Sequence, residues 1–282
     1  SFCLYGQFIS PFYHNPEALD RLLFCAEKRI PLIYIPTIMA GASGPVTMAG
    51  ALTVGNADVL AGLVIHQLKA PGAPFIYGGC VSPFDMKTTV LPYGAPEWHM
   101  SDAILAQLSW RYGLPQFGTA GATDSKVVDE QATLEAAYTL LFAALSGVNL
   151  IHDVGYMESG LTASLDYLVI CDEIISLVRH ILRGCEVDDE TLALDLIDAV
   201  GPGGHFVDSE HTLRHYREVW YPSVLDRRTY DDWSAAGAMT LKQRARIKAK
   251  ELLETHEVPP LVSEVIKGVN RVMDRARQRS VE

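Results

Sequence analysis

The chain has 282 residues, 49% of them hydrophobic, and a formal net charge of −11 at pH 7. This length and composition predict a large buried core, and the acidic balance argues against a nucleic-acid partner. We find no apolar run of about 18 residues or more and therefore predict no membrane span. The cysteines are odd in number and widely spaced, which favours reduced thiols in a cytoplasmic protein. They are Cys3, Cys25, Cys80, Cys171 and Cys185.

Residues 1–160 repeat one pattern, in which an apolar run is followed by a glycine-rich or polar loop and then a helix. The expected strands are 3–10, 31–36, 74–79, 115–119 and 149–153. The expected helices between them are 16–28, 43–68, 99–112 and 126–145. This alternation predicts parallel βα units, and hence an α/β fold.

After Gly160 the pattern changes, and helices follow one another with no strand between them. The expected helices are 162–182, 188–199, 209–217, 240–254 and 258–279. We therefore predict a partial α/β barrel over residues 1–160 and C-terminal helices that pack on it over residues 161–282.

Five strands cannot close an eight-stranded barrel. The sheet is therefore either open, or it contains the last five βα units of a TIM-type (β/α)8 barrel. The sequence starts abruptly, almost at the first expected strand, which favours the second interpretation. On that interpretation the N-terminal strands lie upstream in a longer protein.

Catalytic residues of parallel α/β barrels lie in the loops after the carboxyl ends of the strands. His152 and Asp153 end the fifth expected strand and are therefore the first candidates. A histidine at the end of a buried strand is either a satisfied core residue or a functional one. The two interpretations stand about even, because position in the barrel favours function.

Aromatic residues gather at the strand ends and in the loops that follow. They are Phe12, Tyr13, Tyr34, Tyr77, Phe84, Tyr93, Trp98, Phe117 and Tyr156. For any one of them core packing is the commoner role, but as a group they can form a cage for a cation, at about 0.5–2 kcal/mol per ring. The loops also contain the acidic residues Asp85, Glu97, Asp124, Asp153 and Glu158, which are either solvated or offset the charge of a positive ligand.

The loop MAGASGPVTMAG (39–50) joins the second strand to a helix that we expect to open at Ser43 and Gly44. Amide groups at a helix N-terminus can hold an anion, so these two residues are candidates for binding a carboxylate or phosphate. Glycines in such loops are more often simple turn residues, and both interpretations stay open.

Three histidines, His205, His211 and His215, lie in the segment GGHFVDSEHTLRH (203–215). His211 and His215 are four residues apart on an expected helix and therefore share a face. With His205 or Asp208 they can form a zinc site, although a purely structural role is the commoner one for such a pattern.

Five segments, in this order along the chain, resemble the C-terminal part of the trimethylamine methyltransferase superfamily. They are residues 41–62 (GASGPVTMAGALTVGNADVLAG), 67–79, 84–97, 123–174 and 201–215 (GPGGHFVDSEHTLRH). The resemblance covers most of the chain, and it implies an eight-stranded α/β barrel.

The resemblance also implies an activity, in which a methyl group moves from an amine to the cobalt(I) of a corrinoid (cobalamin) carried by a separate partner protein. The trimethylamine enzymes of this superfamily carry pyrrolysine in the barrel. This sequence contains none, and the segment 123–131, where we expect it, has ordinary residues throughout. Non-pyrrolysine relatives act on quaternary amines such as glycine betaine, proline betaine or carnitine, so a betaine is the expected substrate.

We therefore expect a corrinoid-dependent methyltransferase that is cytoplasmic, homo-oligomeric and paired with a cognate corrinoid protein. Its predicted catalytic residues are His152 and Glu97. Its predicted substrate-binding residues are Ser43, Gly44, Tyr77, Phe84, Trp98, Phe117, Asp124 and Tyr156, and we predict no metal-binding residues. The alternatives are a trimethylamine-type enzyme, a zinc-dependent methyltransferase or hydrolase that uses the histidines of 205–215, and a non-catalytic betaine-binding protein.

Overall fold

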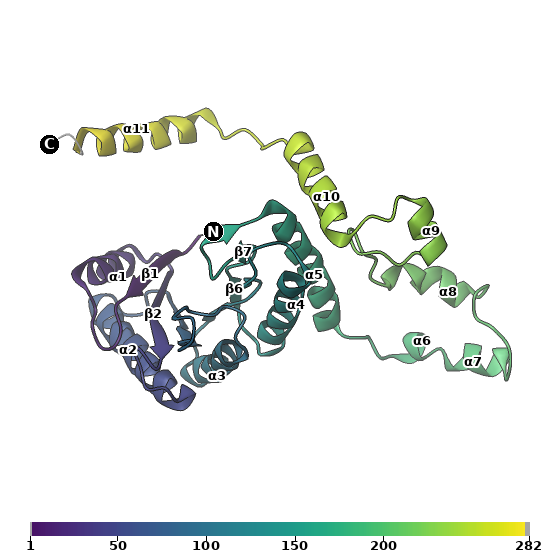
Figure 1. Ribbon diagram of the computed structural model, residues 1–282, viewed down its shortest axis with the longest axis horizontal. Coiled ribbons are helices and arrows are strands. Elements are labelled where there is room, and N and C mark those ends of the chain that lie inside the picture. Colours follow the sequence, from purple (N-terminus) through teal and green to yellow (C-terminus); the bar gives the residue numbers. More distant parts are fainter. Residues whose placement is uncertain (1, 280–282) are drawn as a thin grey trace.

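The computed structural model describes residues 2–279 and begins with a parallel β-sheet (Figure 1). The strands of this sheet are β1 (Leu4–Phe8), β2 (Leu32–Ala40), β3 (Phe75–Gly78), β4 (Cys80–Pro83), β5 (Gln116–Thr119) and β6 (Leu150–His152). Their order is β1-β2-β3-β5-β6, with β4 paired to β2. Every pair is parallel, and the strands of this order follow one another as in the sequence, with only β4 lying outside it.

Four helices connect these strands, namely α1 (Pro16–Lys28), α2 (Met48–Lys69), α3 (Pro96–Tyr112) and α4 (Glu130–Leu145). Leu32, Tyr34 and Phe75 point from the sheet into one core cluster with residues of α1, α2 and α3. Ile151 of β6 packs in a second cluster, with α4. The helices thus cover one face of a sheet whose strands run in sequential order. A doubly wound sheet would instead reverse its strand order and carry helices on both faces.

The opposite face of the sheet is concave. Tyr5 in β1 and His152 in β6 stack with ring centroids 6.1 Å apart, although their strands lie at opposite ends of the strand order. A flat sheet would hold two strands four positions apart about 19 Å away from each other. The sheet is therefore curled like part of a barrel wall, which confirms the α/β class. An eight-stranded TIM barrel stays a prediction.

Helix α2 is long and apolar enough to cross a membrane, by length and composition only. The sequence analysis above predicts no such segment. In the structure α2 lies against the sheet, and a Cβ atom added at Gly62 would meet the Tyr34 ring at 2.5 Å. The close approach explains why a glycine is needed here and gives α2 a place in the core.

Two predicted boundaries are wrong for the same physical reason. The loops expected to begin at Thr37 and Cys80 are strands instead, because residues 37–40 pair in parallel with residues 80–83. A single sequence does not reveal which distant segment will supply the hydrogen bonds. Helix α2 begins at Met48 rather than Ser43, since the N–H groups of Ala42, Ser43 and Gly44 all donate to the carbonyl oxygen of Met39 and close a turn.

A short antiparallel hairpin follows the sheet, formed by β7 (Tyr156–Met157) and β8 (Thr162–Ala163). The expectation of no strand after Gly160 is therefore wrong at β8. The remaining elements are α5 (Leu165–Arg183), α6 (Asp189–Leu192), α7 (Leu194–Val200), α8 (Glu210–His215), the 3-10 helix η1 (Tyr216–Glu218), α9 (Tyr230–Ala235), α10 (Leu241–Thr255) and α11 (Ser263–Arg279). The single helix expected at 188–199 is two helices, because Ala193 adopts a left-handed conformation with φ 49°.

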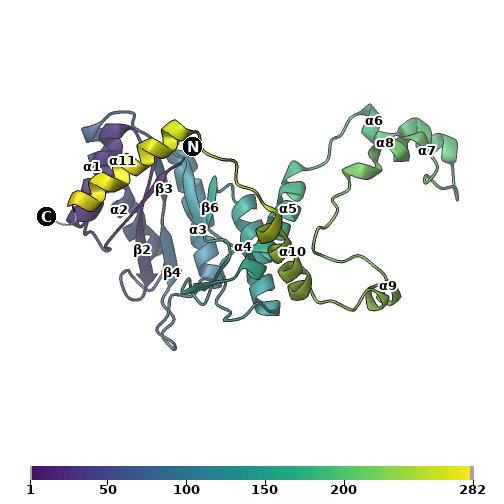
Figure 2. The same ribbon diagram turned by 90° about the horizontal axis from the view of Figure 1, so that it is seen from above.

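Helices α4, α5 and α10 pack together behind β6, and Ala245 of α10 is fully buried among them. Arg246 of α10 forms an ion pair with Asp166 of α5 at 3.0 Å. The segment from α6 to α9 projects away from this body as an arm (Figures 1 and 2). The division of the chain near residue 160 stays a prediction.

One buried carboxylate attaches the arm to the body. Glu173 of α5 is 4% exposed, and its carboxylate accepts hydrogen bonds from the backbone N–H groups of Ser223, Val224 and Leu225, at 2.8–3.1 Å. The Ser223 hydroxyl donates a further bond at 2.6 Å. This contact fixes the chain between η1 and α9 against α5.

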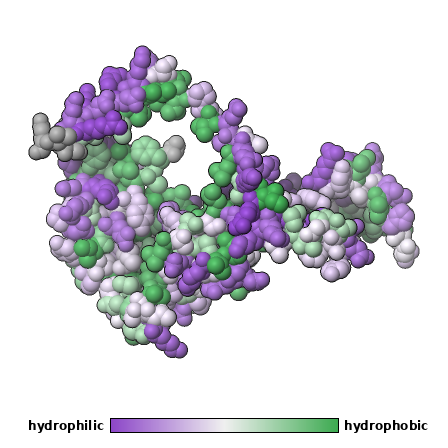
Figure 3. Space-filling model, turned by 45° about the horizontal axis from the view of Figure 1, so that its top comes forward, coloured by the Kyte–Doolittle hydropathy of each residue, from purple (hydrophilic) through white to green (hydrophobic). Residues whose placement is uncertain are grey.

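The last helix, α11, is strongly amphipathic. Its apolar residues Val265, Ile266, Val269, Val272 and Met273 are all at least 44% exposed. Figure 3 shows hydrophilic side chains along the outer rim of the arch that α11 makes and hydrophobic ones along its inner rim.

Candidate active site on the concave face of the sheet

His152 and Asp153 lie where β6 ends and are in direct contact. The Nδ1 atom of His152 pairs with Oδ1 of Asp153. Half of the His152 side chain is exposed, whereas the Asp153 side chain is 10% exposed. Asp153 also has a φ of 73°, a left-handed conformation that costs free energy in a residue with a Cβ. Such local strain is common at functional sites.

Aromatic rings from the first and fourth strands of the sheet order enclose this pair. Phe117 of β5 lies 5.4 Å from the His152 ring, and Tyr5 of β1 lies 5.7 Å from Phe117 in an edge-on arrangement. Phe117 also belongs to a buried cluster on the concave face with Trp98, and Tyr93 packs against that cluster. The rings of Tyr93 and Trp98 are 4.4 Å apart.

Two phenols and one thiol near this pair, those of Tyr5, Tyr93 and Cys80, remain protonated at neutral pH. Burial is the main reason why the pKa values of Tyr5, Cys80 and Tyr93 are raised. The negative charge of Asp153 raises all three pKa values further. The Cys80 thiol is thus neutral and unsuited to act as a nucleophile, since the thiolate is the reactive form.

Asp124 joins three loops at the rim of the site. Its carboxylate accepts hydrogen bonds from the backbone N–H groups of Tyr93, at 2.8 Å, and Gly94, at 2.9 Å. It accepts a third from the Ser159 hydroxyl at 3.0 Å. Asp124 therefore holds Tyr93 in place, and three of the roughly four lone-pair positions of its carboxylate accept bonds from the protein.

The loop after β6 is also bound to the loop after β5. Gly155 donates its N–H to the carbonyl oxygen of Gly121 at 3.1 Å, and Thr123 donates to the carbonyl oxygen of Tyr156 at 3.0 Å. Gly155 has a φ of 90°, and an added Cβ would lie 3.1 Å from the Leu168 side chain. These bonds fix the residues that follow His152, so the site has a preorganised rim.

The structure brings several of the predicted site residues together. His152 and Phe117 are in contact on the concave face. Trp98 is fully buried and packs against Tyr93. Asp124 accepts a hydrogen bond from the Tyr93 N–H. The phenol of Tyr156 contributes to the raised pKa of Tyr93. Tyr93 therefore links these residues.

Other predicted site residues lie elsewhere. Tyr77 faces the helices rather than the concave face, and its hydroxyl donates to Asn56 of α2 at 2.7 Å. The Ser43 hydroxyl accepts from the Met39 N–H at 2.8 Å, and the Ser43 and Gly44 N–H groups donate to the carbonyl oxygen of Met39, so both amides are used within the loop. A role for these two residues in binding an anion stays a prediction.

Two further predicted residues lie on loops near the sheet. Glu97 is exposed in the first turn of α3, where its negative charge acts on Tyr138. Phe84 follows β4, where its backbone N–H donates to Ala40. A role for either residue stays a prediction.

Tyr5 and Cys80 belong to the site although the loop positions do not reveal them. Tyr5 and Gln7 are polar residues spaced by two on a strand whose other face carries Leu4 and Phe8. Alternation of this kind marks the face that does not pack against the helices. This alternation in the sequence could have indicated that Tyr5 faces the site.

The pKa of His152 gives a test of the pair. The hydrogen bond with Asp153 raises the pKa above its usual value of 6.5 and outweighs partial burial, which lowers it. The pairing therefore stabilises the fold below about pH 6.5, and this contribution is lost as the pH rises through the folded-state pKa. We expect Asp153→Asn to lower the His152 pKa, as measured by NMR titration of the imidazole. An unchanged pKa in this variant would contradict the pairing.

Comparisons with known proteins agree with the resemblance noted above. The chain matches the model of the trimethylamine methyltransferase (MTTB) family over residues 5–280. It is 37% identical over 267 residues to the trimethylamine methyltransferase MttB of Methanosarcina barkeri (strain Fusaro / DSM 804), which covers 95% of this chain and 54% of that protein.

Two bacterial relatives are similarly close. One is the glycine betaine methyltransferase of Desulfitobacterium hafniense (strain Y51), 36% identical over 259 residues, or 91% of this chain and 54% of that protein. The other is the trimethylamine methyltransferase MttB of Desulfitobacterium hafniense (strain DSM 10664 / DCB-2), 34% identical over 94% of this chain and 53% of its own length. The chain thus spans about half the length of the curated relatives it matches.

Proposed function

This chain belongs to the trimethylamine methyltransferase family, and from that premise we propose that it carries the active site of an amine methyltransferase. We propose further that its substrate is a quaternary amine with a carboxylate, such as glycine betaine. The methyl acceptor would be the cobalt(I) of a corrinoid bound to a separate protein. The observation that carries the proposal is the His152–Asp153 pair among the rings of Tyr5 and Phe117.

The chemistry needs little from the protein except placement. A quaternary ammonium releases a neutral tertiary amine, so its demethylation requires no proton transfer. As the methyl group leaves, the positive charge on nitrogen disperses. A dry aromatic site solvates the full cation poorly and therefore favours the transition state relative to the bound substrate.

The residues of the concave face suit the two ends of such a substrate. Tyr5, which is 38% exposed, offers aromatic surface to the ammonium group, the buried Phe117 ring supports it edge-on, and Asp153 offsets the charge of the ammonium group. His152 has a raised pKa and an exposed ring edge, so its protonated form can donate a hydrogen bond to a carboxylate. In this proposal His152 orients the substrate.

The site is open on the side where a partner protein would have to dock. His152 ends β6, and Tyr156, which begins β7 soon after it, is 41% exposed. The corrinoid of the partner would supply the cobalt(I) nucleophile. The task of this chain is to present one N-methyl group at that opening and to exclude water behind it.

Trimethylamine is the second candidate substrate, since relatives with that name are as similar to this chain as the glycine betaine enzyme. It has no carboxylate and would leave the His152 donor unused. The sequence contains no pyrrolysine, the residue that the resemblance implies for trimethylamine enzymes. Both points favour a betaine.

The test is methyl transfer to free cob(I)alamin, followed by absorbance, with glycine betaine, proline betaine, carnitine and trimethylamine in parallel. We expect methylcobalamin to form with one of the betaines. Transfer from trimethylamine alone would overturn the choice of substrate. Binding of a betaine without transfer, even with a reduced corrinoid protein present, would instead favour a non-catalytic binding protein.

A further inference from the structure

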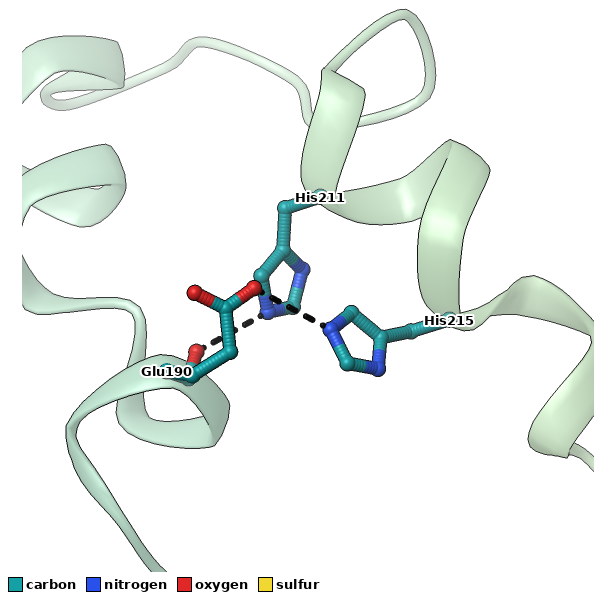
Figure 4. Close-up of side chains that lie close together, drawn as sticks. All are labelled: Glu190, His211 and His215. Atoms are coloured by element: carbon teal, nitrogen blue, oxygen red, sulfur yellow. Dashed lines mark hydrogen bonds and ion pairs between the residues drawn. The ribbon is translucent and has the colours of Figure 1, made fainter.

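A second cluster of chemically reactive side chains lies in the arm, outside the proposed active site. Glu190 of α6 and His211 and His215 of α8 each place one ligand atom within 4.8 Å of the others (Figure 4). The segment that joins α6 to α8 includes α7 and a glycine-containing loop. The three residues thus connect two elements that are separated in the sequence.

The geometry points to a binding site for one divalent transition-metal ion, and we propose that Glu190, His211 and His215 bind Zn²⁺. Two imidazoles and one carboxylate are a donor set that zinc accepts at about 2.0–2.2 Å, so a small inward movement of the side chains would bring these three donors into range, with water as the fourth ligand. His211 and His215 are one helical turn apart, and their ring centroids are 4.4 Å apart. Figure 4 shows both rings directed toward Glu190.

An independent contact orients one of these ligands. The Nδ1 atom of His215 lies 2.8 Å from Oε1 of Glu218, while its Nε2 atom lies 3.3 Å from Oε1 of Glu190. A carboxylate that accepts the Nδ1–H bond fixes the tautomer in which Nε2 carries the free lone pair. Ligating histidines in metalloproteins almost always have such a partner.

Arg214 competes for the same carboxylate, since its guanidinium lies 2.7 Å from Oε1 of Glu190. Oε1 is also the oxygen nearest His215, so a metal ion bound there would have to displace the Arg214 guanidinium. The competition predicts that removal of Arg214 strengthens metal binding rather than weakening it.

The site is accessible from solvent and lies far from the chemistry proposed above. His211 and His215 line a groove of about 850 Å³ together with His180, Cys185 and Glu218, which gives an ion a path of entry. Figures 1 and 2 place α6 and α8 on the projecting arm, away from β6. We therefore assign the ion a structural task, to join α6 to α8, and no part in methyl transfer.

The experiment is titration of the metal-free protein with Zn²⁺ in competition with a chromophoric chelator. We expect one equivalent to bind, and each of His211→Ala, His215→Ala and Glu190→Gln to weaken binding at least tenfold. Glu218→Gln should weaken it about tenfold, the scale for a lost ligand-orienting contact. With Co²⁺ as the probe, the visible absorption bands of a four-coordinate site should appear and should be lost in the same variants.

His205→Ala is the matched control, because His205 lies in the same segment but pairs with Asp208 at 3.4 Å. This variant should bind Zn²⁺ like the unaltered protein, and Arg214→Ala should bind it more tightly. No binding by the unaltered protein would overturn the proposal. An equal loss in His205→Ala, or weaker binding in Arg214→Ala, would also overturn it. Circular dichroism of each variant separates loss of the site from loss of the fold.

Discussion

Replacement of His152 by alanine should lower kcat/KM for methyl transfer from glycine betaine at least about tenfold. A tenfold loss corresponds to roughly 1.4 kcal/mol, the scale of one lost contact that positions the substrate. The reason is geometric, since His152 is the half-exposed member of the pair with Asp153 and lies against Tyr5 and Phe117. The measurement is cob(I)alamin methylation at several substrate concentrations, so that kcat and KM are separated.

A second substrate sharpens this test. Tetramethylammonium has the same cationic head but no carboxylate, so His152→Ala should affect its demethylation much less. His256→Ala is the control, because His256 is exposed at the end of α10. Equal losses with both substrates would refute a role in carboxylate binding, and kinetics like those of the unaltered protein would refute any role for His152.

Replacement of Glu173 by alanine should detach the arm from α5. The variant leaves three backbone N–H groups and one hydroxyl without their acceptor, and the N–H of Val224 is buried. Loss of a buried, hydrogen-bonded carboxylate costs about 3 kcal/mol. That figure corresponds to about 150-fold faster hydrogen exchange at the amides of Ser223, Val224 and Leu225. Asp172→Asn, an exposed change on the same helix, should leave these amides protected.

The same contact has a defined pH dependence. Burial raises the pKa of Glu173, but the hydrogen bonds from Leu225, Ser223 and Val224 outweigh it, and the net pKa lies below its usual value of 4.5. The contact therefore stabilises the fold at pH values above the unfolded-state pKa, and this contribution is lost as the pH falls through the folded-state pKa. In Glu173→Ala, protection of the Ser223, Val224 and Leu225 amides against hydrogen exchange should no longer be lost as the pH falls through the Glu173 pKa. Protection equal to that of the unaltered protein would contradict the anchoring role.

Much of the fold follows from local signals that the sequence carries. The helices that begin at Pro16 and Pro96 have proline in their first turn, where its missing N–H costs nothing. Asp129 caps α4 by accepting a hydrogen bond from the Ala132 N–H. The alternation of apolar runs and helices was enough to predict parallel βα units, and the end of β6 was enough to select His152 and Asp153.

The direction in which each side chain points required the tertiary structure. Tyr77 and Phe117 both lie on buried strands, yet only Phe117 faces the concave side. Strand side chains alternate with a period of two, so a one-residue change of register exchanges the faces. That register is set by the pairing of β3 with β5, which joins residues far apart in the sequence.

The sequence by itself determined the type and order of the elements, the family resemblance and the strand end that carries His152. The tertiary structure decided which groups meet there. The curl of the sheet brings Tyr5 from β1 to His152 at the end of β6, and the folding of the arm brings Glu190 to His211 and His215. Propensity and hydrophobic periodicity act over a few residues, whereas these contacts join residues 21 to 147 positions apart, and only the packed chain specifies them.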